Sequence, residues 1–151
     1  MAAYGSRCGT GAIGCATAGA AARTHLHFAP MSSVTDYALA RRAVLRDLQQ
    51  GALTRLDVCD AHPELLRAAQ FIGTDLDDEC PVCGGLNLRL VSYVYGDKLK
   101  AANGRAISND AELRKLGASY DEFACYDVEV CVECRWNHLV RQSLHGRLHA
   151  S

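Results

Sequence analysis

Two Cys-x-x-Cys motifs constrain the fold of this chain more than any other feature. The first contains Cys80 and Cys83, and the second contains Cys131 and Cys134. Two thiolates separated by two residues bind one tetrahedral ion from a single tight turn, and two such turns form the closed shell of a structural zinc site. The sequence therefore predicts one structural Zn²⁺ on the four cysteines. An iron ion with the same four sulfurs is chemically allowed.

The residues around the two motifs have the pattern of β-strands. Alternating apolar and polar residues predict strands over 86–96, 123–130 and 136–144, and the second of these leads directly into Cys131. The polar segment 97–122 contains an Asn-Gly turn and a helix that Asn109 can cap, so it is predicted to be a small helical insertion. Residues 80–151 are thus predicted to form a three-stranded zinc ribbon with insertion 97–122.

Residues 31–74 are predicted to be a helical segment. Ser33 is the expected N-cap of a first helix, in which apolar residues recur at helical spacing until Gly51. Pro63 at a first helical position starts another helix, which ends at Gly73. A short turn near Thr54 lies between them. The expected fold class is α+β, with short N-terminal helices, an acidic linker over 75–79, and then the ribbon.

Residues 1–30 differ in composition from the rest of the chain. They are rich in alanine and glycine, contain no Asp or Glu, and show no sustained hydrophobic period. We expect either a disordered leader or a segment upstream of a true start at Met31.

Charge and hydropathy limit the partners. The formal net charge is −1, so the chain has no general electrostatic attraction to nucleic acid or to a membrane surface. No run approaches the roughly 18 apolar residues of a membrane helix. Eight cysteines without a convincing signal peptide predict a reducing compartment, the cytoplasm.

Two short segments carry candidate partner contacts. Arg41, Arg42 and Arg46 lie on the polar face of the first predicted helix, where their planar guanidinium groups can bind carboxylates or phosphates. Trp136, Asn137 and His138 follow the second cysteine motif. His138 is four residues past Cys134, so it is either a replacement metal ligand, a partner contact, or a strand-end residue packed near the metal turn.

No residue set in the sequence predicts catalysis. Asp127 and Glu129 lie two apart on one strand face without an accompanying nucleophile at recognisable spacing, so a solvated strand face is predicted. Cys59 and Cys125 are predicted to be buried, small apolar residues. A helix-turn-helix over the N-terminal helices is a weaker alternative, with Leu65 and Arg67 among its reading residues.

Several motifs together resemble a small actinobacterial family of unknown function. They are Tyr37–Arg42, Asp57–Pro63, Cys80–Cys83, Tyr93–Asp97, and Val130–Cys134 with Trp136–Leu139. The resemblance covers about residues 31–150. It implies a bacterial cytoplasmic protein, and it implies no activity.

The leading functional hypothesis is a non-enzymatic zinc-binding adaptor that docks on a macromolecular machine, such as the transcription or translation apparatus. A protein partner is therefore expected, without a membrane and without a small-molecule substrate. The alternative is direct nucleic-acid binding through the arginine-rich helix and the aromatic residues Tyr93, Tyr95 and Trp136. A third hypothesis, a redox or metal-dependent enzyme, requires an open coordination position or a thiol of lowered pKa.

Overall fold

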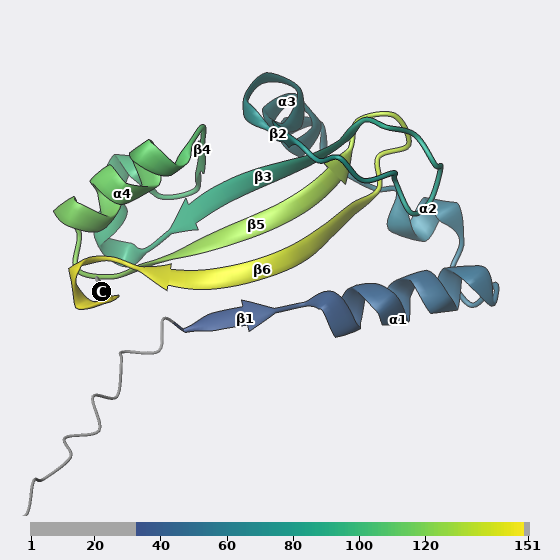
Figure 1. Cartoon of the computed structure of the whole chain (residues 1–151), viewed down its shortest axis with the longest axis horizontal. Helices are drawn as coiled ribbons and strands as arrows, with labels where there is room; N and C mark the ends of the chain where they lie inside the picture. The colour runs from purple at the N-terminus through teal and green to yellow at the C-terminus, as the bar shows by residue number, and fades with distance from the viewer. Residues whose placement is uncertain (1–32, 150–151) are drawn as a thin grey trace, which may run out of the picture.

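One antiparallel sheet of six strands organises the computed structural model, which describes residues 33–149 (Figure 1). Three strands are long: β3 (Leu88–Tyr95), β5 (Phe123–Cys131) and β6 (Asn137–His145). Three are short: β1 (Val34–Asp36), β2 (Thr74–Asp75) and β4 (Arg105–Ile107). The order is β1-β6-β5-β3-β2, and β4 also pairs with β3. The predictions for residues 1–30 and for a start at Met31 lie outside the described residues.

The sheet is larger than the predicted three-stranded ribbon. The three expected strands are present as β3, β5 and β6, but β1, β2 and β4 extend the sheet on both sides. β4 lies inside the predicted insertion and pairs with β3, with Tyr93 opposite Ala106. Strands of two or three residues are too short to show an alternating pattern in the sequence. They form because a neighbouring strand has unpaired backbone groups that can hydrogen-bond with them.

The helices are α1 (Ala38–Gln49), α2 (Arg55–Val58), α3 (Pro63–Ile72) and α4 (Asp110–Ser119), with 3₁₀ turns η1 (Asp97–Ala102) and η2 (Arg147–His149). The first helix begins later than predicted. Residues 34–36 pair with β6 as a strand, and Asp36 accepts a hydrogen bond from the Ala38 backbone N–H at 2.6 Å. Asn109 caps α4 as predicted, because its side chain accepts from the Glu112 N–H at 2.9 Å.

Both faces of the sheet are covered, by different helices. On one face α3 packs on Val91 and Val130. On the other face apolar side chains of α1 pack beside Leu88 and Trp136, at the end of the sheet that carries the cysteines. At the opposite end, α4 packs on a core that contains Phe123. The second face therefore has helical cover at its two ends.

The segment predicted as an acidic linker is partly a strand. Thr74 and Asp75 form β2 and pair with Leu90 and Arg89 of β3. The Arg89 guanidinium also donates to the carbonyl oxygens of Ala69 and Gln70, at 3.2 and 3.0 Å, near the C-terminal end of α3. Cations stabilise the carbonyl end of a helix, so this contact fixes α3 against the sheet.

Candidate metal centre

The four predicted cysteines come together at one end of the sheet. The Sγ atoms of Cys80, Cys83, Cys131 and Cys134 all lie within 4.8 Å of one another. The Sγ atoms of Cys80 and Cys134 are 3.6 Å apart, and those of Cys83 and Cys131 are 3.7 Å apart. A tetrahedral shell with metal–sulfur bonds of about 2.3 Å puts sulfurs about 3.8 Å apart, whereas a disulfide requires about 2.0 Å. The donor set and its spacing therefore fit one thiolate-bound metal ion.

The two cysteine motifs form the same backbone turn. The Gly84 N–H donates to the Cys80 carbonyl at 2.8 Å, and the Arg135 N–H donates to the Cys131 carbonyl at 3.0 Å. Both residues following the second cysteine have left-handed backbones, with φ of 73° at Gly84 and 70° at Arg135. Glycine adopts this conformation readily, whereas an arginine there is strained.

Contacts with Ala61 hold Arg135 in place. Its guanidinium donates to the Ala61 carbonyl at 2.7 Å, and its own carbonyl accepts from the Ala61 N–H at 3.1 Å. These bonds tie the second cysteine turn to the segment just before α3. Sequence reasoning missed Arg135, although aligning the two motifs puts it at the position of Gly84.

The protonation of the thiols differs across the cluster. Burial raises the pKa of Cys80 to about 11, and burial also raises the pKa of Cys134 well above its usual range. Burial acts in the same direction on Cys83, but the Gly85 backbone N–H and the neighbouring thiols outweigh it and lower the pKa of that thiol. The buried thiols are therefore poor nucleophiles until a cation displaces their protons.

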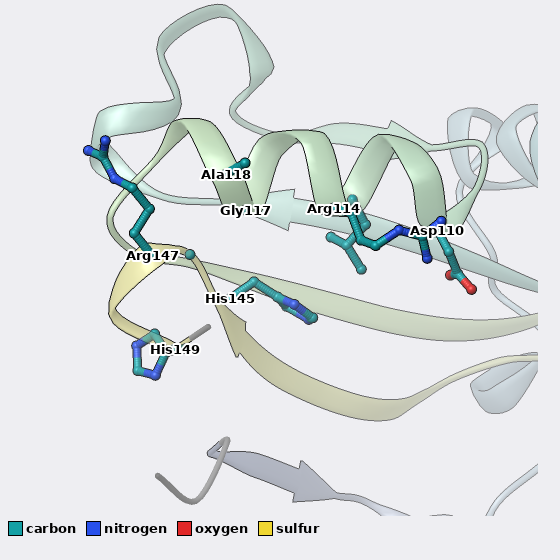
Figure 2. Close-up of a pocket in the computed structure, with 9 residues that line it drawn as sticks. Asp110, Arg114, Gly117, Ala118, His145, Arg147 and His149 are labelled. Atoms are coloured by element: carbon teal, nitrogen blue, oxygen red, sulfur yellow. The ribbon is translucent and has the colours of Figure 1, made fainter. Parts of the chain in front are cut away.

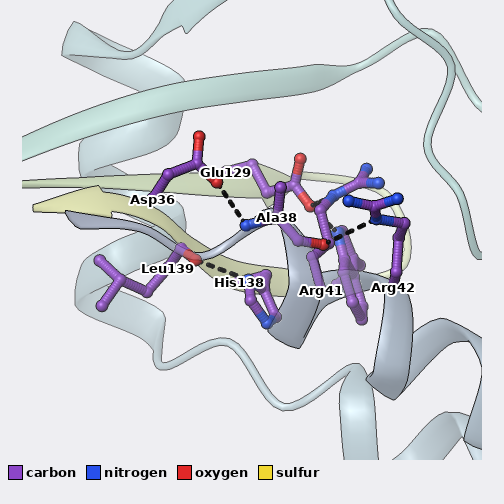
Figure 3. Close-up of polar contacts among 8 residues, drawn as sticks. Asp36, Ala38, Arg41, Arg42, Glu129, His138 and Leu139 are labelled. Atoms are coloured by element: carbon purple, nitrogen blue, oxygen red, sulfur yellow. Dashed lines mark hydrogen bonds and ion pairs between the residues drawn. The ribbon is translucent and has the colours of Figure 1, made fainter.

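A buried polar contact connects the cysteine cluster to α1. Trp136 is 0% exposed, packs with Cys80 and Cys131, and donates from its indole Nε1 to Glu129 Oε1 at 2.9 Å. The Arg41 Nε donates to the same oxygen at 2.6 Å (Figure 3). Trp136 is thus part of the core, which corrects its predicted role as a surface contact. The Arg41 guanidinium is likewise already paired with Glu129.

The predicted solvated face of β5 is buried. Asp127 and Glu129 are each only 5% exposed. Glu129 is paired with Arg41 of α1, and Asp127 with Arg141 of β6. The prediction was wrong because each cation comes from another element, so spacing within β5 does not reveal it. Arg41 lies 88 positions from Glu129, and Arg141 lies on the next strand, 14 positions from Asp127.

The other candidate contacts have different environments. Arg42 and Arg46 of α1 are exposed, and Arg46 forms a surface ion pair with Asp47 at 3.2 Å. Asn137 donates to Asp60 at 2.9 Å. His138 stacks on Trp136, with ring centroids 5.9 Å apart, and is not part of the metal-ligand cluster among the described residues. His138 therefore packs beside the second cysteine turn.

The fold and the site define an α+β protein with a four-cysteine cluster that can hold a metal ion. The chain belongs to a family of unknown function, DUF5318, whose model matches residues 29–151. This confirms the resemblance inferred from the motifs. Within the described residues, no helix has the length and apolar character needed to cross a membrane.

Two of the similar proteins are mycobacterial. An uncharacterized protein of Mycobacterium tuberculosis (strain ATCC 25618 / H37Rv) is 44% identical over 111 residues, which is 74% of this chain and 80% of that protein. An uncharacterized protein of Mycobacterium bovis (strain ATCC BAA-935 / AF2122/97) matches with the same identity and coverage. No solved structure matches the chain significantly.

Proposed function

We propose that this protein is a non-enzymatic adaptor in which the four cysteines hold one structural Zn²⁺. The observation that carries the proposal is the closed tetracysteine cluster beside the buried Trp136. Four thiolates complete a tetrahedral shell and leave no position for a substrate, which is the arrangement of structural rather than catalytic zinc sites. Reduced thiols at these separations also support a reducing compartment, the cytoplasm, as part of the proposal.

The metal would fix the position of α1 as well as the two cysteine turns. One turn precedes β3 and the other follows β5, and Leu88 at the start of β3 pairs with Cys131 at the end of β5, so a shared ion joins the two strands at one end of this central pair. From the second turn, Trp136 and Glu129 reach Arg41, and apolar side chains of α1 pack in the same core as the cysteines. Metal binding therefore supports a defined orientation of α1.

The outer face of α1 is the proposed contact surface. Leu39 is 75% exposed, and Arg42 and Arg46 are exposed on the same helix at positions i+3 and i+7 from it. Residues at this spacing share one helix face, which we call the Leu39 stripe. An apolar side chain beside two guanidinium groups suits a protein partner that has an apolar pocket bordered by carboxylates. We propose that this partner is a protein of the transcription or translation apparatus.

Nucleic-acid binding is the second proposal, with less support. The buried Trp136 cannot stack on a base, and Arg41 is paired with Glu129. Arg42, Arg46 and the 47% exposed Tyr95 remain as contacts. Phosphate contacts make binding strongly salt-dependent, and this dependence distinguishes the two proposals.

The test is affinity capture from the source organism with the zinc-loaded protein, with and without nuclease. We expect a protein that survives nuclease, disappears when Leu39, Arg42 and Arg46 are all changed to Ala, and binds directly when purified. The matched control is Arg67→Ala, which removes an exposed arginine of α3 paired with Glu64. A partner that is lost after nuclease treatment would support nucleic-acid binding. A partner that is still captured by the triple alanine variant would contradict the proposed contact surface on α1.

A further inference from the structure

A groove lies between α4 and the C-terminal part of the chain, away from the cysteine cluster (Figure 2). It consists of two adjoining cavities of about 620 and 370 Å³, which share Asp110, Leu113, His145 and His149 as lining residues. Figure 2 shows Gly117 and Ala118 on the helix and His145 on the strand side. Cavities of these sizes are typical of small-molecule sites.

The smaller cavity contains a buried carboxylate that orients a half-exposed arginine. The Asp127 side chain is 7% exposed and accepts from the Arg141 Nε and Nη2 atoms at 2.8 and 2.6 Å, both on Oδ2. The Ser92 hydroxyl donates to the other oxygen at 2.6 Å. The Arg141 side chain is 52% exposed, and within the described residues its Nη1 is left for a further acceptor. This arrangement fixes a guanidinium edge at the cavity.

A second polar pair lies two residues along the same strand. Ser143 Oγ and His145 Nε2 are 2.8 Å apart, and His145 stacks on Phe123. Whichever of the two atoms holds the proton, one donor remains: the hydroxyl when Nε2 is protonated, or Nδ1–H when the hydroxyl donates. The pair can therefore donate one hydrogen bond to a ligand that is bound by Arg141.

The charges around the groove nearly balance, which disfavours a ligand with two negative charges. Asp127 balances Arg141, and burial lowers the pKa of His145, so that its ring is neutral at neutral pH. Arg147 is paired with Asp121, and the His149 Nε2 lies 2.7 Å from a carboxylate oxygen of Glu122. Arg114 and Asp110 both line the larger cavity and have opposite charges. A dianionic phosphate would find little net positive charge here.

The larger cavity is suited to an apolar group. Its helix side carries Leu113, Gly117 and Ala118, which present no charge to the groove. A Cβ atom added at Gly117 would meet only the Gly146 nitrogen, at 3.9 Å, so the absence of a side chain there keeps the groove open. An extended hydrocarbon chain can lie along this wall from the polar cavity.

We propose that this groove binds a small monocarboxylate with an apolar tail, its carboxylate on Arg141 and the Ser143–His145 pair and its tail along α4. The geometry that carries the proposal is the cavity that joins an oriented, half-exposed guanidinium to an apolar wall. The site is separate from the metal centre and from the Leu39 stripe.

The experiment is an NMR titration of the zinc-loaded full chain with octanoate, 1-octanol and inorganic phosphate. We expect saturable shifts around Gly117 and Gly146 with octanoate, and a dissociation constant of about 1 mM or below for a ligand of this size. Octanol, which has the same chain length and no charge, binds at least tenfold more weakly, and phosphate does not bind at the groove. Absence of octanoate binding, equal binding of octanol, or a preference for phosphate would overturn the proposal.

Two variants separate binding from folding. Asp127→Asn with Arg141→Gln removes both charges together, so no buried charge is left unpaired, and Gly117→Leu fills the groove without touching that pair. Both should weaken octanoate binding at least tenfold and keep a dispersed amide spectrum. Ala111→Leu changes an exposed residue of α4 outside the groove lining and should leave affinity unchanged. Unchanged affinity in Gly117→Leu would contradict the assigned position of the tail.

Discussion

Gly84 and Arg135 occupy the same place in the two cysteine turns, each directly after the second cysteine and each with a left-handed backbone, at φ of 73° and 70°. The first turn uses the residue that adopts this conformation at least cost. The second uses an arginine, whose strain of about 1–2 kcal/mol is offset by the two hydrogen bonds to Ala61. The second turn is thereby coupled to the segment before α3.

This relationship predicts an order of stabilities at position 135. Arg135→Ala keeps the backbone strain and loses the guanidinium bond, so it should lower the free energy of unfolding by about 1–2 kcal/mol. Arg135→Gly loses the same bond but relieves the strain, and should be more stable than the alanine variant by about 1 kcal/mol. Urea unfolding in the presence of zinc measures both. An alanine variant as stable as the glycine variant would show that no strain is present.

A matched prediction concerns the first turn. At Gly84 an added Cβ would meet no atom within 4 Å, so Gly84→Ala tests the backbone conformation alone. We expect a loss of about 1 kcal/mol in the same urea experiment. No loss at this position would contradict the left-handed turn.

Neighbouring arginines of α1 should differ strongly in importance. Arg41→Met leaves the carboxylate of Glu129, 6% exposed, without its cation, and should cost about 2–3 kcal/mol of unfolding free energy. This expected loss is smaller than the roughly 3–5 kcal/mol lost when one partner of a fully buried ion pair is removed, because the Arg41 side chain is 29% exposed. Arg42→Met on the exposed face is the control, with an expected change within about 0.5 kcal/mol. Equal effects of the two substitutions would contradict the burial of Glu129.

The single tryptophan should report on the metal. Trp136 is fully buried in the same core as Cys80 and Cys131, so its emission should lie at short wavelength in the zinc-loaded protein. Removal of the metal by a chelator should open this core and shift the emission to the red, and added zinc should reverse the shift. A Phe71→Ala variant, which changes an exposed residue of α3, should behave like the original protein. Emission unaffected by metal removal would contradict the coupling of the site to the core.

Cys125 should be unreactive in the folded protein. Burial first, and then the charge of Asp127, raises the pKa of its thiol to about 12, so at pH 8 only about one thiol in 10⁴ is ionised. The same shift stabilises the folded protein below pH 9 and is lost as the pH rises toward 12. Mass mapping after iodoacetamide treatment at pH 8 should find the half-buried Cys59 modified before Cys125. The reverse order would contradict the burial of Cys125.

The sequence carried enough information for the parts of the fold that have a local pattern. Strands β3 and β5 are eight and nine residues long and rich in apolar residues, and each lies next to a cysteine motif, so both strands and the cysteine cluster could be predicted. Residues 34–36 had no such pattern. They form β1 because β6 offers them free backbone groups, and α1 therefore begins at Ala38.

Partners distant in sequence explain the errors at the site. Glu129 looked like a solvated strand residue because its cation is Arg41, 88 positions away. Trp136 looked like a surface aromatic because the core that covers it includes residues of α1 and α2. The groove below α4 is likewise formed by a helix and a strand whose pairing no local spacing reveals.

The most direct test of the structural zinc site is native mass spectrometry of the protein together with four variants, in which Cys80, Cys83, Cys131 or Cys134 is changed to Ser. We expect one tightly bound zinc per chain, and in each variant a loss of that zinc together with a red shift of Trp136 emission. Cys125→Ser is the matched control and should retain the metal. A protein that binds no metal, or one that keeps its zinc when any of the four cysteines is removed, would contradict the structural zinc site.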